Sequence, residues 1–177
     1  MAVKSNIKSK AFVVGNNIDT DQIYPGRYLT IVDPQEIASH CLEGADETIA
    51  KRFEKGNIIV GGSNFGCGSS REHAAIALVH MGASVVIADS FARIFYRNAI
   101  NLALPLLVCK GASQMIKDGD EVEVDLLSGI VKNVRTGETL QGEKISDYAM
   151  KILNAGGIKP MFRERAREIN KKLGLTK

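Results

Sequence analysis

The stretch NIIVGGSNFGCGSSREHAAIALVHMGASVVIADSFARIFYRNAINLALPLLVCK, residues 57–110, decides the fold of this chain. Three short runs within it, NIIVGG, SVVIADS and LPLLVCK, are rich in β-branched residues or leucine and predict buried strands. Two segments with helical periodicity, EHAAIALVHMG and SFARIFYRNAINLAL, separate these runs. Because strands that alternate with helices usually pair in parallel, the stretch predicts a parallel sheet.

The flanking segments predict that the sheet is mixed. AFVV at residues 11–14 predicts an earlier strand, and the NNIDTD that follows predicts a turn, since Asn and Asp bind their own backbone. Between residues 120 and 141 the apolar period changes to two, as in antiparallel strands. The sequence therefore predicts an α/β fold with a β-rich second half.

Start and stop signals predict further helices. Asp33 precedes a first-turn proline and a capping-box glutamate, and predicts a helix that closes at Gly44. A short helix is expected over residues 47–55, where Gly56 follows. SDYAMKILNAGG, residues 146–157, predicts another helix because it starts with a serine cap and stops at glycine.

Length and composition fit one globular domain, which we expect over residues 1–177 with a basic helical extension at 160–177. The net charge of +3 is too small to indicate a nucleic-acid-binding surface. The longest apolar stretch, around residues 102–109, is too short to span a membrane, and the first ten residues lack the apolar segment of a secretory signal. We therefore expect a cytoplasmic protein that binds neither nucleic acid nor membrane.

The three cysteines are widely spaced. Cys41, Cys67 and Cys109 form no CxxC pair, so the sequence offers neither a zinc site nor a complete iron–sulfur ligand set. Buried reduced thiols are the simplest interpretation. Cys67 is the exception, because it lies in a glycine-rich segment that suits a ligand.

This glycine-rich junction, residues 61–78, lies between a predicted strand and a predicted helix. Its four glycines allow a ligand to approach the backbone, and the helix start favours negative charge. Ser69, Ser70 and Arg71 add two hydroxyls and a guanidinium that can bind a carboxylate with two bonds. A purely structural junction, in which Ser70 caps the helix and Arg71 pairs with Glu72, fits the spacing equally well. The motifs of nucleoside triphosphate, dinucleotide and nucleophile-elbow sites are absent.

GCGSSREHA at 66–74 and GASVVIADSFARIFYRNAINLALPLL at 82–107 resemble the mobile domain of the aconitase superfamily. NNIDTDQIYPGRYL at 16–29 is similar to the same family. The resemblance covers about residues 10–110 and implies a swivelling domain with a three-layer β/β/α fold. In the dehydratases of leucine biosynthesis this domain is a separate small subunit, which implies a hydro-lyase that interconverts 2-isopropylmalate and 3-isopropylmalate and is active only with a large subunit.

The resemblance also implies a cofactor and roles for four residues. In the family a 4Fe-4S cluster is bound by three cysteines of the large subunit and acts as a Lewis acid, so this chain is expected to bind no metal itself. Ser69 matches the family's base, and Ser70 and Arg71 match groups that hold a substrate carboxylate. Asp21 matches a carboxylate near the active site that orients a neighbouring side chain or water. Serine becomes a base only where nearby donors stabilise its alkoxide.

Other residues near these segments receive weaker roles. Cys67 and Gly68 are expected close to the substrate, and His73 is expected there as a packing or capping residue on the helix. Asp19 is expected to serve turn structure. The arginines of FARIFYRN, residues 91–98, could reach an anion, but a solvated helix face explains them more simply.

Residues Tyr28, Leu29, Thr30 and Ile31 match a family loop that contacts the variable substituent of the substrate. Family members that act on citrate or homocitrate relatives place an arginine in or just after this loop, and this sequence has none there, which favours an apolar substituent. Apolar pockets discriminate weakly, so 2,3-dimethylmalate, citraconate and homoaconitate hydratases stay open as alternatives. A non-catalytic carboxylate-binding module is the alternative from another class, and the assembly is expected to be a heterodimer or heterotetramer.

Overall fold

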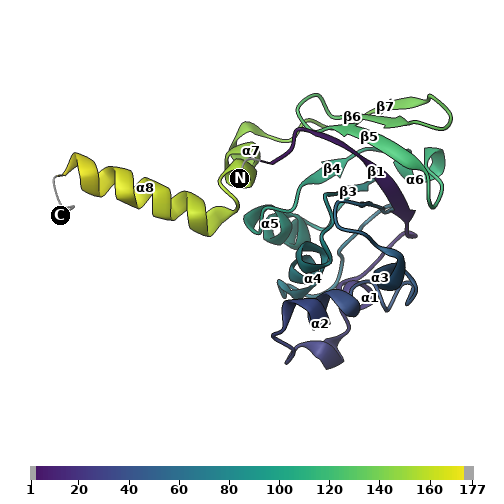
Figure 1. Cartoon of the computed structure of the whole chain (residues 1–177), viewed down its shortest axis with the longest axis horizontal. Coiled ribbons are helices and arrows are strands. Elements are labelled where there is room, and N and C mark those ends of the chain that lie inside the picture. Colours follow the sequence, from purple (N-terminus) through teal and green to yellow (C-terminus); the bar gives the residue numbers. More distant parts are fainter. Residues whose placement is uncertain (1–2, 174–177) are drawn as a thin grey trace.

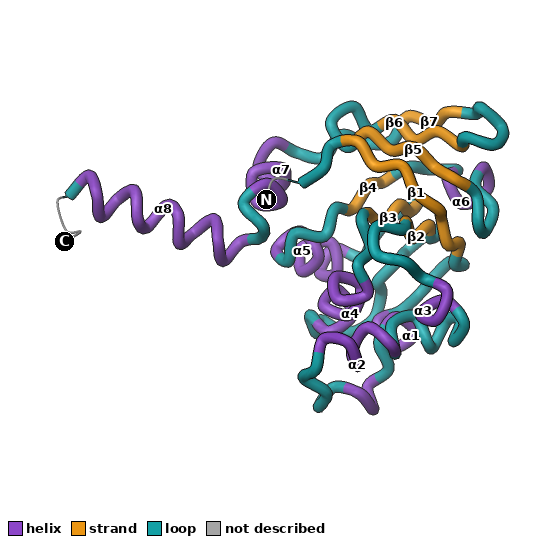
Figure 2. The backbone as a smooth tube through the Cα atoms, viewed as in Figure 1, coloured by secondary structure: helices purple, strands orange, loops and turns teal. Residues whose placement is uncertain are grey.

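The computed structural model describes residues 3–173, which form a seven-stranded mixed sheet with helices (Figures 1 and 2). The strand order is β4-β3-β2-β1-β5-β6-β7. The strands are β1 (Asn6–Val13), β2 (Ile58–Val60), β3 (Val85–Ala88), β4 (Leu106–Val108), β5 (Glu121–Asp125), β6 (Ile130–Asn133) and β7 (Thr139–Gln141). Strands β1 to β4 pair in parallel, whereas β5, β6 and β7 extend the other edge of β1 in antiparallel fashion. The predicted change from a parallel to an antiparallel half is confirmed.

Helices connect the parallel strands and close the C-terminal part of the chain. They are α1 (Thr20–Ile23), the 3₁₀ helix η1 (Gly26–Tyr28), α2 (Pro34–Ser39), α3 (Ile49–Arg52), α4 (His73–Met81), α5 (Arg93–Asn101), α6 (Ala112–Met115), α7 (Asp147–Asn154) and α8 (Ile158–Lys172). The two helices expected between the parallel strands are α4 and α5, and the helix expected after the serine cap is α7. Ser146 does cap α7, since its hydroxyl accepts a bond of 3.2 Å from the backbone N–H of Ala149.

Two cores give the domain three layers. Successive side chains of a strand point to opposite faces, so Ile59 and Val86 face the helices in a helix-side core, where they pack with residues of α2, α4 and α5. Ile58 and Val85 face the other way and pack with Val124 of β5 in an inter-sheet core. The antiparallel half, together with α6 and α7, therefore covers one face of the parallel half, while α2, α4 and α5 cover the opposite face (Figure 1). This arrangement is the β/β/α layering that the resemblance implied.

Two helix predictions were wrong in length. The helix capped by Asp33 ends at Ser39, not at Gly44, because the chain leaves the helix to bond the segment of α1: Leu42 donates 2.7 Å to the carbonyl of Ile23. A Cβ on Gly44 would lie 2.6 Å from the Cα of Gln22, so this glycine permits a close backbone contact. The helix expected over residues 47–55 is the single turn of α3.

Helix α8 projects from the rest of the molecule (Figures 1 and 2). It begins close to Pro160, as predicted, and none of its described residues is buried. Neither α8 nor any other helix within residues 3–173 is long and apolar enough to cross a membrane.

Candidate functional site

The glycine-rich loop between β2 and α4 is fastened to the start of α1. The backbone N–H of Thr20 donates to the carbonyl of Cys67 at 2.8 Å, and the Thr20 hydroxyl accepts from the N–H of Ser69 at 3.0 Å. Gly66 has φ +79°, and a Cβ there would lie 2.2 Å from Cγ of Phe95, so only glycine fits. These contacts fix the backbone on both sides of the loop that carries the serine pair.

Ser69 and Arg71 form the most specific arrangement in this loop. Ser69 Oγ accepts two hydrogen bonds, from the side-chain Nε of Arg71 at 2.9 Å and from its backbone N–H at 3.3 Å. Both donors favour a negative charge on that oxygen, and the Nε bond comes from a charged group. Ser69 is half-buried and Arg71 is exposed. The arrangement can thus stabilise a serine alkoxide beside a surface that a partner could cover.

Asp21 and Arg71 meet although fifty residues separate them. The Oδ1 of Asp21 lies 3.4 Å from Nη2 of Arg71, with 64% of the Asp21 side chain and 42% of the Arg71 side chain exposed. An ion pair this exposed contributes little to stability in water. Its effect is to orient the guanidinium, and the Arg71 partner seen here is Asp21 rather than the Glu72 of the purely structural interpretation.

Asp19 and Ser70 differ in their roles. Asp19 is the N-cap of α1 and shares a capping box with Gln22, so its predicted structural role is confirmed. Ser70 does not cap α4, whose N-cap position is Glu72 without a side-chain bond. Ser70 is exposed, and its backbone carbonyl accepts a hydrogen bond of 3.2 Å from Nδ2 of Asn98. The hydroxyl of Ser70 is therefore placed by the loop and not used by the helix.

His73 is the first residue of α4 and packs against the helix-side core. Its ring stacks on Tyr24 with centroids 6.5 Å apart and planes 7° apart. Its Nδ1 is buried without a hydrogen-bond partner among the described residues.

Gly68 lies against Thr20 and has φ +104°. A Cβ added to Gly68 would lie 3.1 Å from the hydroxyl of Thr20.

The loop expected to contact the substrate's substituent is largely packed. The hydroxyl of Tyr28 donates a hydrogen bond of 3.0 Å to Oε1 of Glu43, and the Tyr28 ring stacks on His40 with a centroid distance of 3.7 Å. Burial of Glu43 opposes its ionisation, but hydrogen bonds from His40, Tyr28 and an arginine outweigh it and lower the pKa of Glu43. Leu29 and Ile31 pack partly buried against the helix-side core. Thr30 is exposed.

A hollow of about 390 Å³ beside Ser69 is lined in part by four residues that the sequence-based site prediction left out. Its lining comes from the glycine-rich loop and from the start of α5: Gly66, Gly68, Ser69, Ala92, Arg93 and Ile94. Arg93 is exposed and has no hydrogen-bond or ion-pair partner within residues 3–173, and half of Ile94 is exposed. Their position just after the carboxyl end of a parallel strand, where ligands of such sheets bind, was the signal for them.

The described residues do not supply a ligand set for a metal cluster. Within residues 3–173 no three His, Cys, Asp or Glu side chains lie close enough to bind one metal ion. Cys41 and Cys109 are buried in the two cores, and burial raises the pKa of both thiols, that of Cys109 to about 11. Cys67 is half-buried in the glycine-rich loop.

Comparison with known proteins relates most of the chain to one group of enzymes. A sequence model of the aconitase C-terminal domain matches residues 46–110. The isopropylmalate/citramalate isomerase small subunit of Methanocaldococcus jannaschii is 52% identical over 166 residues, which cover 94% of this chain and 99% of that protein. The 3-isopropylmalate dehydratase small subunit 1 of Methanopyrus kandleri is 55% identical over 152 residues, 86% of this chain and 89% of that protein.

A solved structure agrees with these sequence relatives. The crystal structure of a 3-isopropylmalate dehydratase from Methanocaldococcus jannaschii superposes with a TM-score of 0.90 at 45% identity. The superposition covers 94% of this chain and 99% of the crystallised chain. The similarity therefore extends well beyond the segment that the domain model matches.

Proposed function

Since the chain belongs to the family of 3-isopropylmalate dehydratase small subunits, we propose that it is the small subunit of a hydro-lyase that interconverts 2-isopropylmalate and 3-isopropylmalate in leucine biosynthesis. The small-subunit names of the relatives imply a large-subunit partner. We place the 4Fe-4S cluster on that partner, where it would supply the Lewis acid for the leaving hydroxyl.

The observation that carries this proposal is the double hydrogen bond to Ser69 Oγ. The side chain of free serine is a poor general base, because the alkoxide that would accept the proton is hardly populated in water near neutral pH. The two donors from Arg71 lower the free energy of the alkoxide, and a closed site without water would strengthen both bonds. We propose that Ser69 takes the proton from the carbon next to the one that loses its hydroxyl.

Substrate carboxylates would be held by the groups around this serine. The guanidinium of Arg71 is oriented by Asp21, and the hydroxyl of Ser70 is exposed beside it. Arg93 lines the hollow beside Ser69, and we propose that it supplies a second cation for a dicarboxylic acid. Cys67, Gly68 and the residues of the 28–31 loop would complete the surroundings without reacting.

A reconstitution assay tests the proposal. The chain is mixed anaerobically with a cluster-loaded large subunit, and the interconversion of the two isopropylmalates is followed. We expect turnover from the mixture and none from either subunit alone. A mixture that forms a stable complex without any hydro-lyase activity would contradict the proposed function and favour the non-catalytic carboxylate-binding module.

Isomerisation of citramalate is a second candidate, because the relative from Methanocaldococcus jannaschii is named as an isopropylmalate/citramalate isomerase. Ile94 is half-exposed and lines the hollow, and we propose that it and the 28–31 loop provide apolar surroundings for either an isopropyl or a methyl substituent. Such a pocket separates the two by about 1–3 kcal/mol. Values of kcat/KM for the reconstituted complex on both acids decide between them, and a preference for homocitrate or citrate would overturn the apolar interpretation.

A further inference from the structure

Helix α8 carries an apolar stripe that nothing in the described chain covers. Phe162, Ala166 and Ile169 of α8 and its C-cap residue Leu173 follow each other at intervals of four, three and four residues, which places them on one side of the helix. The exposed fractions are 53% for Phe162, 47% for Ile169 and 65% for Leu173. These are among the largest apolar side chains exposed on the molecule, and they line up along one element.

The body of the protein stabilises only the base of this helix. Ile158 and Met161 pack partly buried against the inter-sheet core, and α8 contacts α7 and α5 there. Beyond that first turn the helix extends away from the domain (Figure 1). A helix of fifteen residues with no packing along most of its length is marginal in water. Its stripe therefore fits a surface outside this chain.

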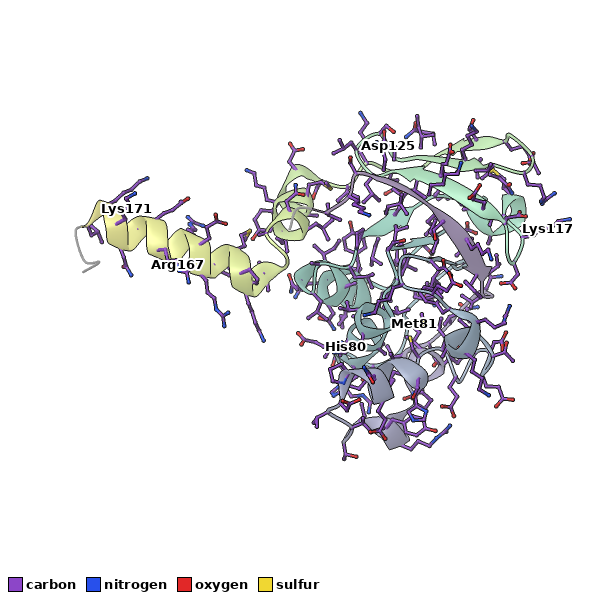
Figure 3. The ribbon with its side chains drawn as sticks, viewed as in Figure 1. His80, Met81, Lys117, Asp125, Arg167 and Lys171 are labelled. Carbon is purple, nitrogen blue, oxygen red and sulfur yellow. The ribbon has the colours of Figure 1, made fainter. Side chains whose placement is uncertain are left out.

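The charges of α8 are distributed unevenly around its axis. At 100° per residue, Lys159, Arg163, Arg165 and Lys172 fall along the two sides of the stripe, so both flanks are basic. The far face holds two glutamates together with Arg167 and Lys171, which Figure 3 labels, and its charges cancel. The uncompensated positive charge of the helix thus lies beside the apolar stripe.

This distribution indicates the chemistry of the partner. Two copies of α8 packed stripe to stripe would bring their basic flanks together, and like charges at these positions oppose pairing. An apolar groove with acidic side chains at its rim would instead match both the stripe and its flanks.

We propose that α8 is a docking helix that inserts its apolar stripe into an acid-rimmed groove of the large subunit. The proposal rests on the proposed function, because that function provides the large subunit. Docking through a projecting helix would attach the small subunit at a distance from the Ser69 loop. The site loop could then move against the cluster-bearing surface while the subunits stay associated.

Binding of the full-length chain to a purified, cluster-loaded large subunit tests the stripe. The double variant Phe162→Ser, Ile169→Ser is expected to raise the dissociation constant about tenfold or more, since apolar anchors dominate such interfaces. The control is Leu127→Ser, which removes a side chain of similar exposure, 61%, from the turn between β5 and β6. We expect this control to bind within about twofold of the unchanged chain.

Charge reversal tests the flanks against the far face. Arg163→Glu with Arg165→Glu is expected to weaken binding about tenfold, and the loss should shrink as salt rises. Arg167→Glu with Lys171→Glu changes the net charge equally on the far face and is expected to bind within about twofold of the unchanged chain. If both charge reversals weaken binding equally, the attraction is not specific to the flanks of the stripe, and the proposed acid-rimmed groove is wrong.

Activity measurements separate a failure of this proposal from a failure of the function. The stripe variant is expected to regain full isomerase activity when the large subunit is in excess, because no α8 residue belongs to the proposed site. If the stripe variant binds the large subunit with unchanged affinity and the complex is active, the docking role of α8 is wrong while the proposed function stands. If the unvaried chain is a dimer by ultracentrifugation and the stripe variant a monomer, the stripe serves a second copy and the proposal is wrong.

Discussion

At the scale of single residues, the proposed chemistry depends on how the hydroxyl of Ser69 is held. Ser69 lies two residues before Arg71, and the loop curls so that both the backbone N–H and the Nε of that arginine reach the serine oxygen. Thr20 and Asp21 come from a separate segment and hold the same loop from its other side. A serine two residues before an arginine is common in protein sequences. The two hydrogen bonds that converge on Ser69 Oγ are what support its proposed role as a base.

Ser69→Ala is expected to lower kcat of the reconstituted complex by about 10²–10⁴, while the affinity for substrate changes little, because a base acts in the transition state. Steady-state kinetics with each isopropylmalate measure this. Ser63→Ala, in an exposed part of the same loop, is the control and is expected to leave kcat unchanged. A kcat near that of the unchanged enzyme would remove Ser69 as the base.

Arg93→Gln is expected to raise KM about tenfold or more with little change in kcat, since a charged hydrogen bond to a substrate carboxylate contributes about 1.5–3 kcal/mol. Arg97→Gln is the matched control, because Arg97 is also exposed and lies on α5 one turn further along. If both variants have the same KM as the unchanged enzyme, Arg93 belongs to a solvated helix face.

At the scale of elements, the antiparallel half is fastened by a buried carboxylate. Asp120 precedes β5, is 8% exposed, and accepts bonds from Asn133 at 2.7 Å and from Nε and Nη2 of Arg135 at 2.7 and 3.0 Å. It also accepts from the N–H of Lys117 at 2.9 Å. These bonds join the start of β5 to the end of β6. The hydrogen bonds from Arg135 hold the pKa of Asp120 far below its usual value.

Asp120→Asn is expected to reduce the free energy of unfolding by about 1–3 kcal/mol at pH 7. Because the folded-state pKa of Asp120 is lowered, its stabilising effect is complete above the unfolded-state pKa, about 4, and is lost as the pH falls below it. The difference between the variant and the unchanged protein should therefore shrink between pH 5 and about pH 3 in urea unfolding. Thr139→Ala, which changes an exposed residue of the same hairpin that has no ionisable side chain, should show no such pH-dependent difference. A difference that is constant with pH would rule out the linkage.

At the scale of the whole molecule, the domain presents the exposed surface of the proposed site and a projecting helix. Ser70, Arg71, Arg93 and Ile94 are all exposed around the glycine-rich loop. A ligand pocket normally buries most of its ligand, so this surface needs a second wall. The large subunit implied by the relatives' names would supply that wall.

The isolated chain is accordingly expected to bind isopropylmalate weakly, with a dissociation constant of about 1 mM or higher, and the reconstituted complex is expected to bind it much more tightly. Isothermal titration of both samples compares them, with Arg71→Ala in the complex as the control for binding at this site. Micromolar binding by the chain alone would favour a stand-alone carboxylate-binding module.

Much of the fold followed from local patterns, because they depend on residues close in the sequence. The strands of residues 57–110, the helices between them, the antiparallel hairpins and the Ser146 cap were all predicted correctly. Helix ends after Asp33 and near residue 50 were wrong, since contacts with α1 and with neighbouring loops decide where those helices stop. Helix propensity cannot anticipate such a distant contact.

The sequence by itself determined the parallel and antiparallel halves of the sheet, the family and the serine–arginine loop, because each is written in a contiguous stretch. Only the tertiary structure decided that Asp21 meets Arg71 across fifty residues, that Arg93 lines the hollow at Ser69, and that α8 leaves the body. The physical reason is that such contacts form when whole elements pack through their buried faces. No local sequence pattern predicts which residues the side chains at the edges of those elements will contact.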